Sequence, residues 1–579
     1  MAASSSVGAG GSSWSKWQIA LAVGAPVAIG LGYWYLKQSG TSAGKDSRSQ
    51  LDESRNKAPS LATANQVSLD NSGTDSISKT DIFEENPLKR ALAHKGAGNT
   101  FFKQGKYAEA IECYNEAIET CPPDKTHDLS TFYQNRAAAY EQLKMYGEVR
   151  EDCTRALKLN PKYVKALQRR AKACELTHDL QQSLEDITAA CILEGFQNQT
   201  TLLTADRVLK ELGRQHAKEA MAKRKTIMPS KHFIKTYFSS FIEDPVTNSI
   251  SQEKESDSAE ADLRGFAQAK QAFAKLNYDD IVPACTEEID SDGPHKLESL
   301  VLRATFYLLL GDHASAFKDF QTVIDDENAD VKLRVNALIK RASLHMQLEQ
   351  AAKSLEDFNM AAKLDANNSD VYHHRGQVHL LMEKVNDAMD DFKKAVTLSP
   401  NFPIAYVQKC YTDYRHAFQS RNMEKMEEVM KDFQSAIQRF PTCSECYTLF
   451  AQVLCDQQEY EKADSYFRKA TEVEPDNATV YVHRGLLQLQ WTGDVPKAME
   501  LIKQALKMDD RCEFGYETLG TIEVQRGNLR HAVELFDKAI PLAKTELEMS
   551  HLFSLRDAAV AQATVAEKMG IPIPNMGGS

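Results

Sequence analysis

Residues 130–161, which read STFYQNRAAAYEQLKMYGEVREDCTRALKLNP, carry the pattern that decides the fold. A small residue is followed by apolar or small residues 12, 16 and 19 positions later, and a proline comes five positions after the last of these. Small residues are needed where two helices nearly touch, and bulky ones fill the space between helix pairs. The stretch therefore predicts two packed helices, with key positions Ala137, Val149, Cys153, Ala156 and Pro161.

The same spacing recurs from Leu88 onward, where helical periodicity dominates and convincing alternating strands are absent. Neighbouring copies are often 34 residues apart, as Ala137 and Ala171 are. Degenerate copies are expected near Tyr278 and Phe433, which gives about eleven copies in all. The first-helix small residues of the clearer copies are Gly98, Ala137, Ala171, Ala304, Ala342, Gly376, Ala451, Gly485 and Gly520.

This spacing is typical of the tetratricopeptide repeat, a helix pair of 34 residues. The predicted fold is all-α: a tetratricopeptide-repeat superhelix of about eleven repeats, preceded by an N-terminal transmembrane helix. Such a superhelix has a concave groove that binds extended peptides or helices. No P-loop, dinucleotide fingerprint or HExxH motif occurs, so we expect a binding protein and not an enzyme.

The composition narrows the partners and the chemistry. A net charge of -12 disfavours nucleic acid, which requires a basic footprint. The eleven cysteines are scattered, mostly among apolar residues, as expected for buried free thiols in a reducing compartment. Cys443 and Cys446 form one CxxC, without a second pair at metal-ligand spacing. We therefore expect no metal and no cofactor.

Residues 17–36, WQIALAVGAPVAIGLGYWYL, form a candidate transmembrane helix without a charged side chain. A helix of this length rises about 30 Å, enough to cross a bilayer core. Aromatic residues lie at both ends, where membrane interfaces favour them. Five basic residues follow the segment within residues 37–57, whereas only Lys16 precedes it, so the C-terminal part is predicted to be cytosolic. The rival interpretation is a cleaved secretory signal, which the few basic residues before the segment disfavour.

Five polar residues fall on the first helices of the first three repeats. Lys95 and Asn99 share a face of repeat one, because they are four residues apart. Asn135 lies on the equivalent helix of repeat two, and Lys165 and Arg169 on that of repeat three. Cations and amides lining one groove suit a peptide's terminal carboxylate and its backbone. Taken singly, each residue is an ordinary solvated position, so the hypothesis rests on all five together.

These five positions resemble the carboxylate clamp of co-chaperone tetratricopeptide domains. The whole chain also resembles the animal form of the seventy-kilodalton import receptors of the translocase of the outer mitochondrial membrane, the TOM complex. The resemblance covers the anchor, the clamp, the connecting segment and the C-terminal repeats. It is carried by residues Tyr163–Ala173, Cys191–Gln199, Leu302–Gly311, Asn336–Ser343, Asp370–Gln377, Glu474–Trp491 and Glu517–Asn528.

The resemblance implies a receptor that docks cytosolic heat-shock chaperones of the seventy- and ninety-kilodalton classes through their acidic C-terminal tails. It would accept mitochondrial preproteins, notably hydrophobic carriers with internal targeting signals, and pass them to the import pore with other TOM complex subunits. It would be a single-pass protein of the mitochondrial outer membrane, with its N-terminus in the intermembrane space and its C-terminal domain in the cytosol.

Two other functions are less favoured by these features. The alternative function is a membrane-anchored tetratricopeptide co-chaperone of another organelle, such as the endoplasmic reticulum. An enzyme with accessory repeats is disfavoured, because no room remains for a catalytic domain.

The expected organisation combines the repeat pattern with this resemblance. The predicted parts are a short tail (1–16), a transmembrane anchor (17–36), a disordered linker (37–85), an N-terminal tetratricopeptide clamp domain (86–195), connecting helices with an acidic loop (196–262) and a C-terminal tetratricopeptide preprotein-binding domain (263–579).

Overall fold

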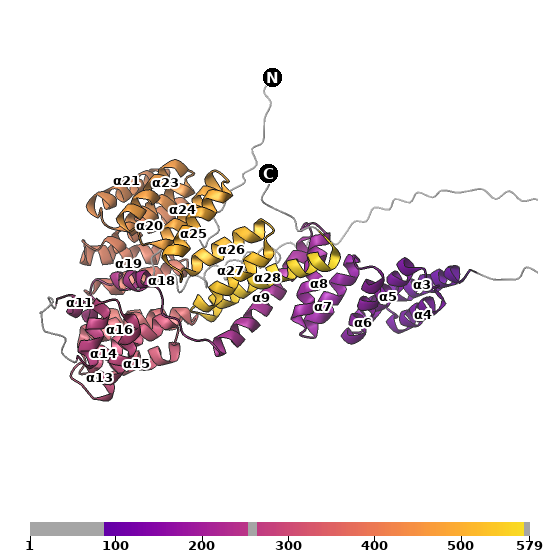
Figure 1. Cartoon of the computed structure of the whole chain (residues 1–579), viewed down its shortest axis with the longest axis horizontal. Helices are drawn as coiled ribbons and strands as arrows, with labels where there is room; N and C mark the ends of the chain where they lie inside the picture. The colour runs from indigo at the N-terminus through magenta and orange to yellow at the C-terminus, as the bar shows by residue number, and fades with distance from the viewer. Residues whose placement is uncertain (1–85, 253–262, 572–579) are drawn as a thin grey trace, which may run out of the picture. The chain divides into compact units, whose positions relative to one another are not determined.

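The computed structural model describes residues 86–252 and 263–571, which form α-helices joined by short turns (Figure 1). No β-strand occurs within these ranges, which confirms the all-α prediction. The predicted tail, anchor and linker at 1–16, 17–36 and 37–85 lie outside the described residues. Within those that are described, no helix is both long and apolar enough to cross a membrane.

The described residues divide into two compact units. The N-terminal unit comprises residues 86–212 and 557–571. It contains three helix pairs, the beginning of α9 and the end of α28. Its helices are α3 (Pro87–Lys103), α4 (Tyr107–Thr120), α5 (Thr126–Gln142), α6 (Tyr146–Leu159), α7 (Val164–Leu176), α8 (Leu180–Leu193), α9 (Gln199–Ala222) and α28 (Glu546–Met569).

The C-terminal unit, Gly213–Arg556, contains eight further helix pairs, preceded by α10 and α11. Eleven pairs in the described chain confirm the predicted number of repeats. The helices are α10 (Lys231–Ser239), α11 (Pro245–Gln252), α12 (Gly265–Ala274), α13 (Ile281–Asp290), α14 (Lys296–Leu310), α15 (His313–Asp325), α16 (Val331–Gln347), α17 (Ala351–Leu364), α18 (Ser369–Leu381), α19 (Val385–Leu398), α20 (Pro403–Gln419), α21 (Met423–Arg439), α22 (Ser444–Asp456), α23 (Tyr460–Val473), α24 (Ala478–Trp491), α25 (Val495–Met508), α26 (Glu513–Gln525) and α27 (Leu529–Ala539).

In several repeats, a glycine of the first helix faces a bulky residue of the second. A Cβ atom on Gly98 would lie 2.6 Å from Cε1 of the Tyr114 ring, and one on Gly520 would lie 2.8 Å from the Phe536 ring. Carbon atoms cannot approach so closely, so a larger residue would force the two helices apart. This contact is the physical basis of the spacing seen in the sequence.

In five repeats an ion pair lies next to this contact. Its arginine comes one residue before the small residue of the first helix, and its aspartate comes one residue before the facing residue of the second helix. Arg303 illustrates it: Nε and Nη2 donate to the two carboxylate oxygens of Asp319 at 2.7 and 2.9 Å. The side chains are 14% and 5% exposed, so the pair is largely removed from water. The five pairs are Arg136–Asp152, Arg170–Asp186, Arg303–Asp319, Arg341–Asp357 and Arg375–Asp391.

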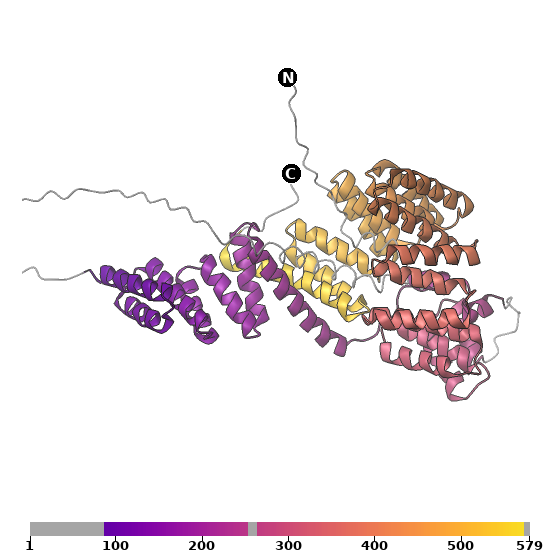
Figure 2. The same ribbon diagram turned by 180° about the vertical axis from the view of Figure 1, so that it is seen from behind.

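Helices α10 and α11 are not a repeat; they pack against the first helices of the C-terminal unit. Phe238 of α10 contacts Phe306 of α14, with ring centroids 6.0 Å apart. Lys340 of α16 is buried, donates to Asp244 at 2.7 Å and lies 5.2 Å from the centroid of the Phe241 ring. Both views of the chain show α11 beside α16 (Figures 1 and 2).

Asp370 of α18 holds the turn between α10 and α11. Its carboxylate oxygens accept from the backbone N–H groups of Ile242, at 3.1 Å, and Glu243, at 2.8 Å. Glu243 in turn accepts from the backbone N–H of Ser369 at 2.8 Å. Burial outweighs the hydrogen bonds and raises the pKa of Asp370 to about 7. The segment is therefore fixed by polar contacts as well as by apolar packing.

The Arg303–Asp319 pair provides a test of the ion-pair pattern. Arg303→Met leaves Asp319 buried without its cation, which should lower the free energy of unfolding by about 3 kcal/mol. Adding Asp319→Leu removes the unpaired charge and should recover most of this loss. Urea unfolding followed by circular dichroism measures both variants. A double variant as unstable as the single one would contradict this account.

The pKa of Asp370 predicts a pH dependence of stability. The folded state keeps the proton up to about pH 7, whereas the unfolded chain releases it near the ordinary value of 3.8. The carboxyl therefore stabilises the fold least at high pH, and its contribution falls as pH rises from about 4 to 7. We expect the unfolding temperature of the wild type, relative to Asp370→Asn, to be higher at pH 5 than at pH 8. Parallel pH profiles for the two proteins would refute the assignment.

Candidate functional site

The five predicted clamp residues lie on the first helices of the three repeats in the N-terminal unit. Lys95 and Asn99 belong to α3, Asn135 to α5, and Lys165 and Arg169 to α7. Lys165 is exposed, and the other four are partly buried. Since α3, α5 and α7 are consecutive first helices that pack on one another, the residues occupy one row of adjacent helices.

The two asparagines are in direct contact. Asn135 Nδ2 donates to Asn99 Oδ1 at 3.2 Å, and the Tyr114 hydroxyl donates to the same oxygen at 2.9 Å. Burial raises the pKa of Tyr114 to about 12, so this hydroxyl keeps its proton at neutral pH. Asn99 Nδ2 and Asn135 Oδ1 have no hydrogen bond within the described chain, which leaves one donor and one acceptor for a peptide backbone.

Arg169 is engaged by an acidic neighbour. Its Nε donates to Glu141 Oε2 at 2.7 Å, and Lys172 Nζ donates to Glu141 Oε1 at 2.8 Å. Burial would raise the pKa of Glu141, but Lys172 and Arg169 outweigh it and lower that pKa below its ordinary value. The Nη1 atom of Arg169 is buried without a hydrogen-bond partner among the described residues. Arg169 therefore has one guanidinium nitrogen, Nη1, without a partner, and Glu141 neutralises part of its charge.

The two lysines differ from Arg169 in having no such neighbour. Neither Lys95 nor Lys165 forms an ion pair or a side-chain hydrogen bond with another described residue. Their ammonium groups are therefore available for an external anion. The contacts join Asn99 to Asn135 directly and leave the three cations as separate points of charge.

Two residues that shape this region were not predicted as part of it. Tyr114 lies sixteen residues after Gly98, at the bulky position of repeat one, and its hydroxyl also orients Asn99. Glu141 had no role in the prediction, although it binds Arg169. Tyr114 carries a usable signal, since its repeat position faces the first helix. Glu141 lies near the end of α5 and has no distinctive spacing within the repeat pattern.

Most of the cysteine thiols are shielded from solvent. The eleven cysteines are free, and nine are buried. A hydrogen bond that the Cys443 thiol donates to Cys446, followed by burial, raises the pKa of Cys443 well above its ordinary value. Such thiols stay protonated and react slowly.

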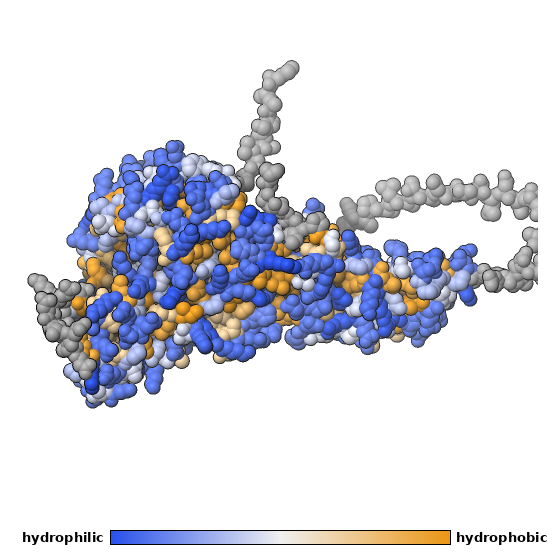
Figure 3. All heavy atoms as spheres, in the orientation of Figure 1, coloured by the Kyte–Doolittle hydropathy of each residue, from blue (hydrophilic) through white to orange (hydrophobic). Residues whose placement is uncertain are grey.

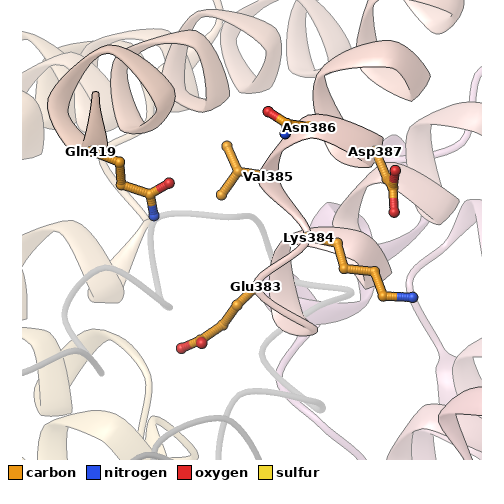
Figure 4. A pocket seen from close by; sticks show the side chains of 6 residues that line it. All are labelled: Glu383, Lys384, Val385, Asn386, Asp387 and Gln419. Carbon is orange, nitrogen blue, oxygen red and sulfur yellow. The ribbon is translucent and has the colours of Figure 1, made fainter. Parts of the chain in front are cut away.

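A cavity of about 310 Å³ opens at the turn between α18 and α19 (Figure 4). Five of its six lining residues are polar or charged and exposed, and Val385 alone is apolar and buried. Blue, hydrophilic residues likewise cover much of the face in Figure 3, with orange residues between them. The cavity has too little apolar surface to enclose a small molecule.

Comparison with known proteins agrees with the repeat pattern. Models described as "Tetratricopeptide repeat" match residues 91–124, 130–163, 369–402 and 448–512. The crystal structure of yeast Tom70 aligns with a TM-score of 0.47 at 25% sequence identity, covering 84% of this chain and 99% of that one.

Similarity to curated proteins extends over nearly the whole chain. Rat "Mitochondrial import receptor subunit TOM70" is 48% identical over 583 residues, which cover 98% of this chain and 95% of that protein. The human protein of the same name is 48% identical over 573 residues, covering 97% of this chain and 94% of that protein. The chain thus belongs to the TOM70 family of mitochondrial import receptor subunits.

Proposed function

We propose that this import receptor docks cytosolic chaperones of the seventy- and ninety-kilodalton heat-shock classes through Lys95, Asn99, Asn135, Lys165 and Arg169. The acidic C-terminal tail of the chaperone would supply the carboxylates. Lys95 and Lys165 provide unpaired cations, and the asparagine pair provides a donor and an acceptor for the peptide backbone.

The observation that carries this proposal comes from the C-terminal unit. Counted from the small residue of each first helix, Lys340 occupies the repeat position of Arg169, two residues before it. Asp370 occupies that of Lys165, six residues before it. Lys340 and Asp370 both bind a separate stretch of chain, the turn after α10. Side chains at these two positions are thus suited to hold a chain segment, and in the N-terminal unit both are cationic.

The preprotein would bind the first helices of the C-terminal unit. Support comes from α10, whose Ile234 and Phe238 are buried against the apolar core formed with these helices. A surface that accepts one amphipathic helix in this way suits the apolar helical segments of carrier preproteins. Two binding sites on one chain raise the effective concentration of the second event once the first has occurred.

The receptor would be anchored in the mitochondrial outer membrane by residues 17–36, with its repeats in the cytosol and other TOM complex subunits as neighbours. The curated relatives named as mitochondrial import receptors support this location over the endoplasmic reticulum. The five basic residues within 37–57 support the cytosolic side.

Lys165→Ala tests the clamp most cleanly, because Lys165 is exposed and its truncation removes no internal contact. Losing a charge-assisted hydrogen bond should weaken binding of an acidic chaperone-tail peptide about tenfold or more. Arg169→Ala should abolish binding while the protein stays folded, since Lys172 still neutralises Glu141. Isothermal calorimetry measures the affinity.

Lys158→Ala is the matched control, because it removes the same charge from an exposed position on α6, a second helix. Its affinity should equal that of the wild type. The peptide with an amidated C-terminus should bind weakly to all variants. Unchanged affinity of Lys165→Ala and Arg169→Ala, or an equal loss in Lys158→Ala, would exclude the clamp assignment.

The anchor has its own test. Deleting residues 1–37 removes the apolar segment and should release the protein from mitochondria into the cytosol, since no helix of the described residues is long and apolar enough to span a bilayer. Cell fractionation measures the distribution. A truncated protein that still sediments with membranes would show that residues 17–36 are not the sole anchor.

A further inference from the structure

Three metal-ligating side chains meet in the C-terminal unit, away from the clamp. His232 lies in the first turn of α10, and Glu474 and Asp476 lie in the turn between α23 and α24. One ligand atom from each residue lies within 4.8 Å of those of the other two. His232 is more than 240 residues from its two neighbours in the sequence, so folding alone brings the three together.

The two ring nitrogens of His232 differ in their surroundings. Nε2 lies 3.4 Å from the Thr236 hydroxyl, which also donates to the His232 carbonyl oxygen at 3.0 Å. Nδ1 is buried without a hydrogen-bond partner among the described residues. A buried polar atom without a partner is costly unless something binds it.

What faces Nδ1 is a carboxylate. Glu474 Oε1 lies 3.8 Å from His232 Nδ1, too far for a hydrogen bond. The other oxygen of Glu474 accepts from Asn477 Nδ2 at 3.0 Å, which orients the carboxylate. The side chain of Asp476 is exposed and forms no hydrogen bond within the described chain. An imidazole nitrogen and two carboxylates thus converge without a hydrogen bond between them.

The spacing suits a small divalent cation. Zinc binds imidazole nitrogen and carboxylate oxygen at about 2.0–2.2 Å, so ligands around a tetrahedral ion lie about 3.3 Å apart. The His232–Glu474 separation of 3.8 Å needs only a small closure. Asp476 can rotate to complete the set, because its side chain is exposed. Two carboxylates balance the charge of the ion, and hydrogen-bonded Nε2 and Asn477 fit the outer contacts that metal ligands usually have.

We propose that His232, Glu474 and Asp476 bind a divalent transition-metal ion of the zinc class, with a fourth position left to water. The ion joins α10 to the turn between α23 and α24. It therefore fastens the segment that lies along the first helices of this unit, at the end opposite to its attachment by Asp370. This site is independent of the chaperone clamp.

The test titrates Zn²⁺ into the full-length protein, freed of metal by a chelator and kept reduced, using isothermal calorimetry. We expect one saturable site and a rise in unfolding temperature on binding. His232→Ala and Asp476→Asn should each weaken the affinity at least tenfold and remove the rise. Asp476→Asn alters only an exposed side chain, so it keeps the test valid if His232→Ala fails to fold.

His531→Ala is the matched control, because His531 is an exposed histidine beside Glu534 and should contribute nothing. Co²⁺ should give a visible spectrum of nitrogen and oxygen ligation without a sulfur charge-transfer band. Equal binding in wild type and Asp476→Asn, or a spectrum of thiolate ligation, would overturn the proposal. The proposal would also be overturned if no Zn²⁺ bound and His232→Ala destabilised the protein only at low pH, which is the behaviour of a simple ion pair.

Discussion

The fold depends on one local constraint repeated along the chain: the two helices of a repeat must approach closely at one point. A small residue of the first helix meets a bulky residue of the second, as Gly98 meets Tyr114. In five repeats an arginine and an aspartate, each one residue earlier, add a buried ion pair at the same place. Packing sets the distance between the helices, and the ion pair, costly to break, sets their register.

Because this constraint joins residues only sixteen positions apart, it could be predicted from the sequence. The number of repeats and the small positions follow directly from it. Contacts between distant segments leave no periodic signal. Lys568 near the end of α28 pairs with Glu185 of α8 at 2.6 Å, which places the end of this helix in the N-terminal unit. The hydrogen bonds between Asp370 and the α10–α11 turn could not be predicted from the sequence either, because neither partner has unusual spacing.

The candidate clamp could be located for the same reason, because its residues lie on the first helices that this spacing defines, and two of them, Asn135 and Arg169, share one repeat position. What the sequence could not provide is the state of each side chain. Asn99 and Asn135 turned out to bind each other, and Arg169 shares its charge with Glu141. The three cations are therefore unequal: Lys95 and Lys165 have no acidic partner among the described residues, whereas Glu141 already occupies one donor of Arg169.

The first helices of both units thus carry charged side chains at the same two positions, and the sign of the charge differs at only one of them. In the C-terminal unit, Lys340 and Asp370 hold the chain's own segment, which buries Ile234 and Phe238 on the same surface. A covalently attached segment has a high effective concentration, so a preprotein helix that uses this surface must compete with it or pack beside it. The carboxyl of Asp370, with a pKa of about 7, makes that attachment sensitive to conditions near neutrality. Binding of a helix to this surface would therefore be coupled to the position of α10 and α11, because the two would share the same apolar contacts.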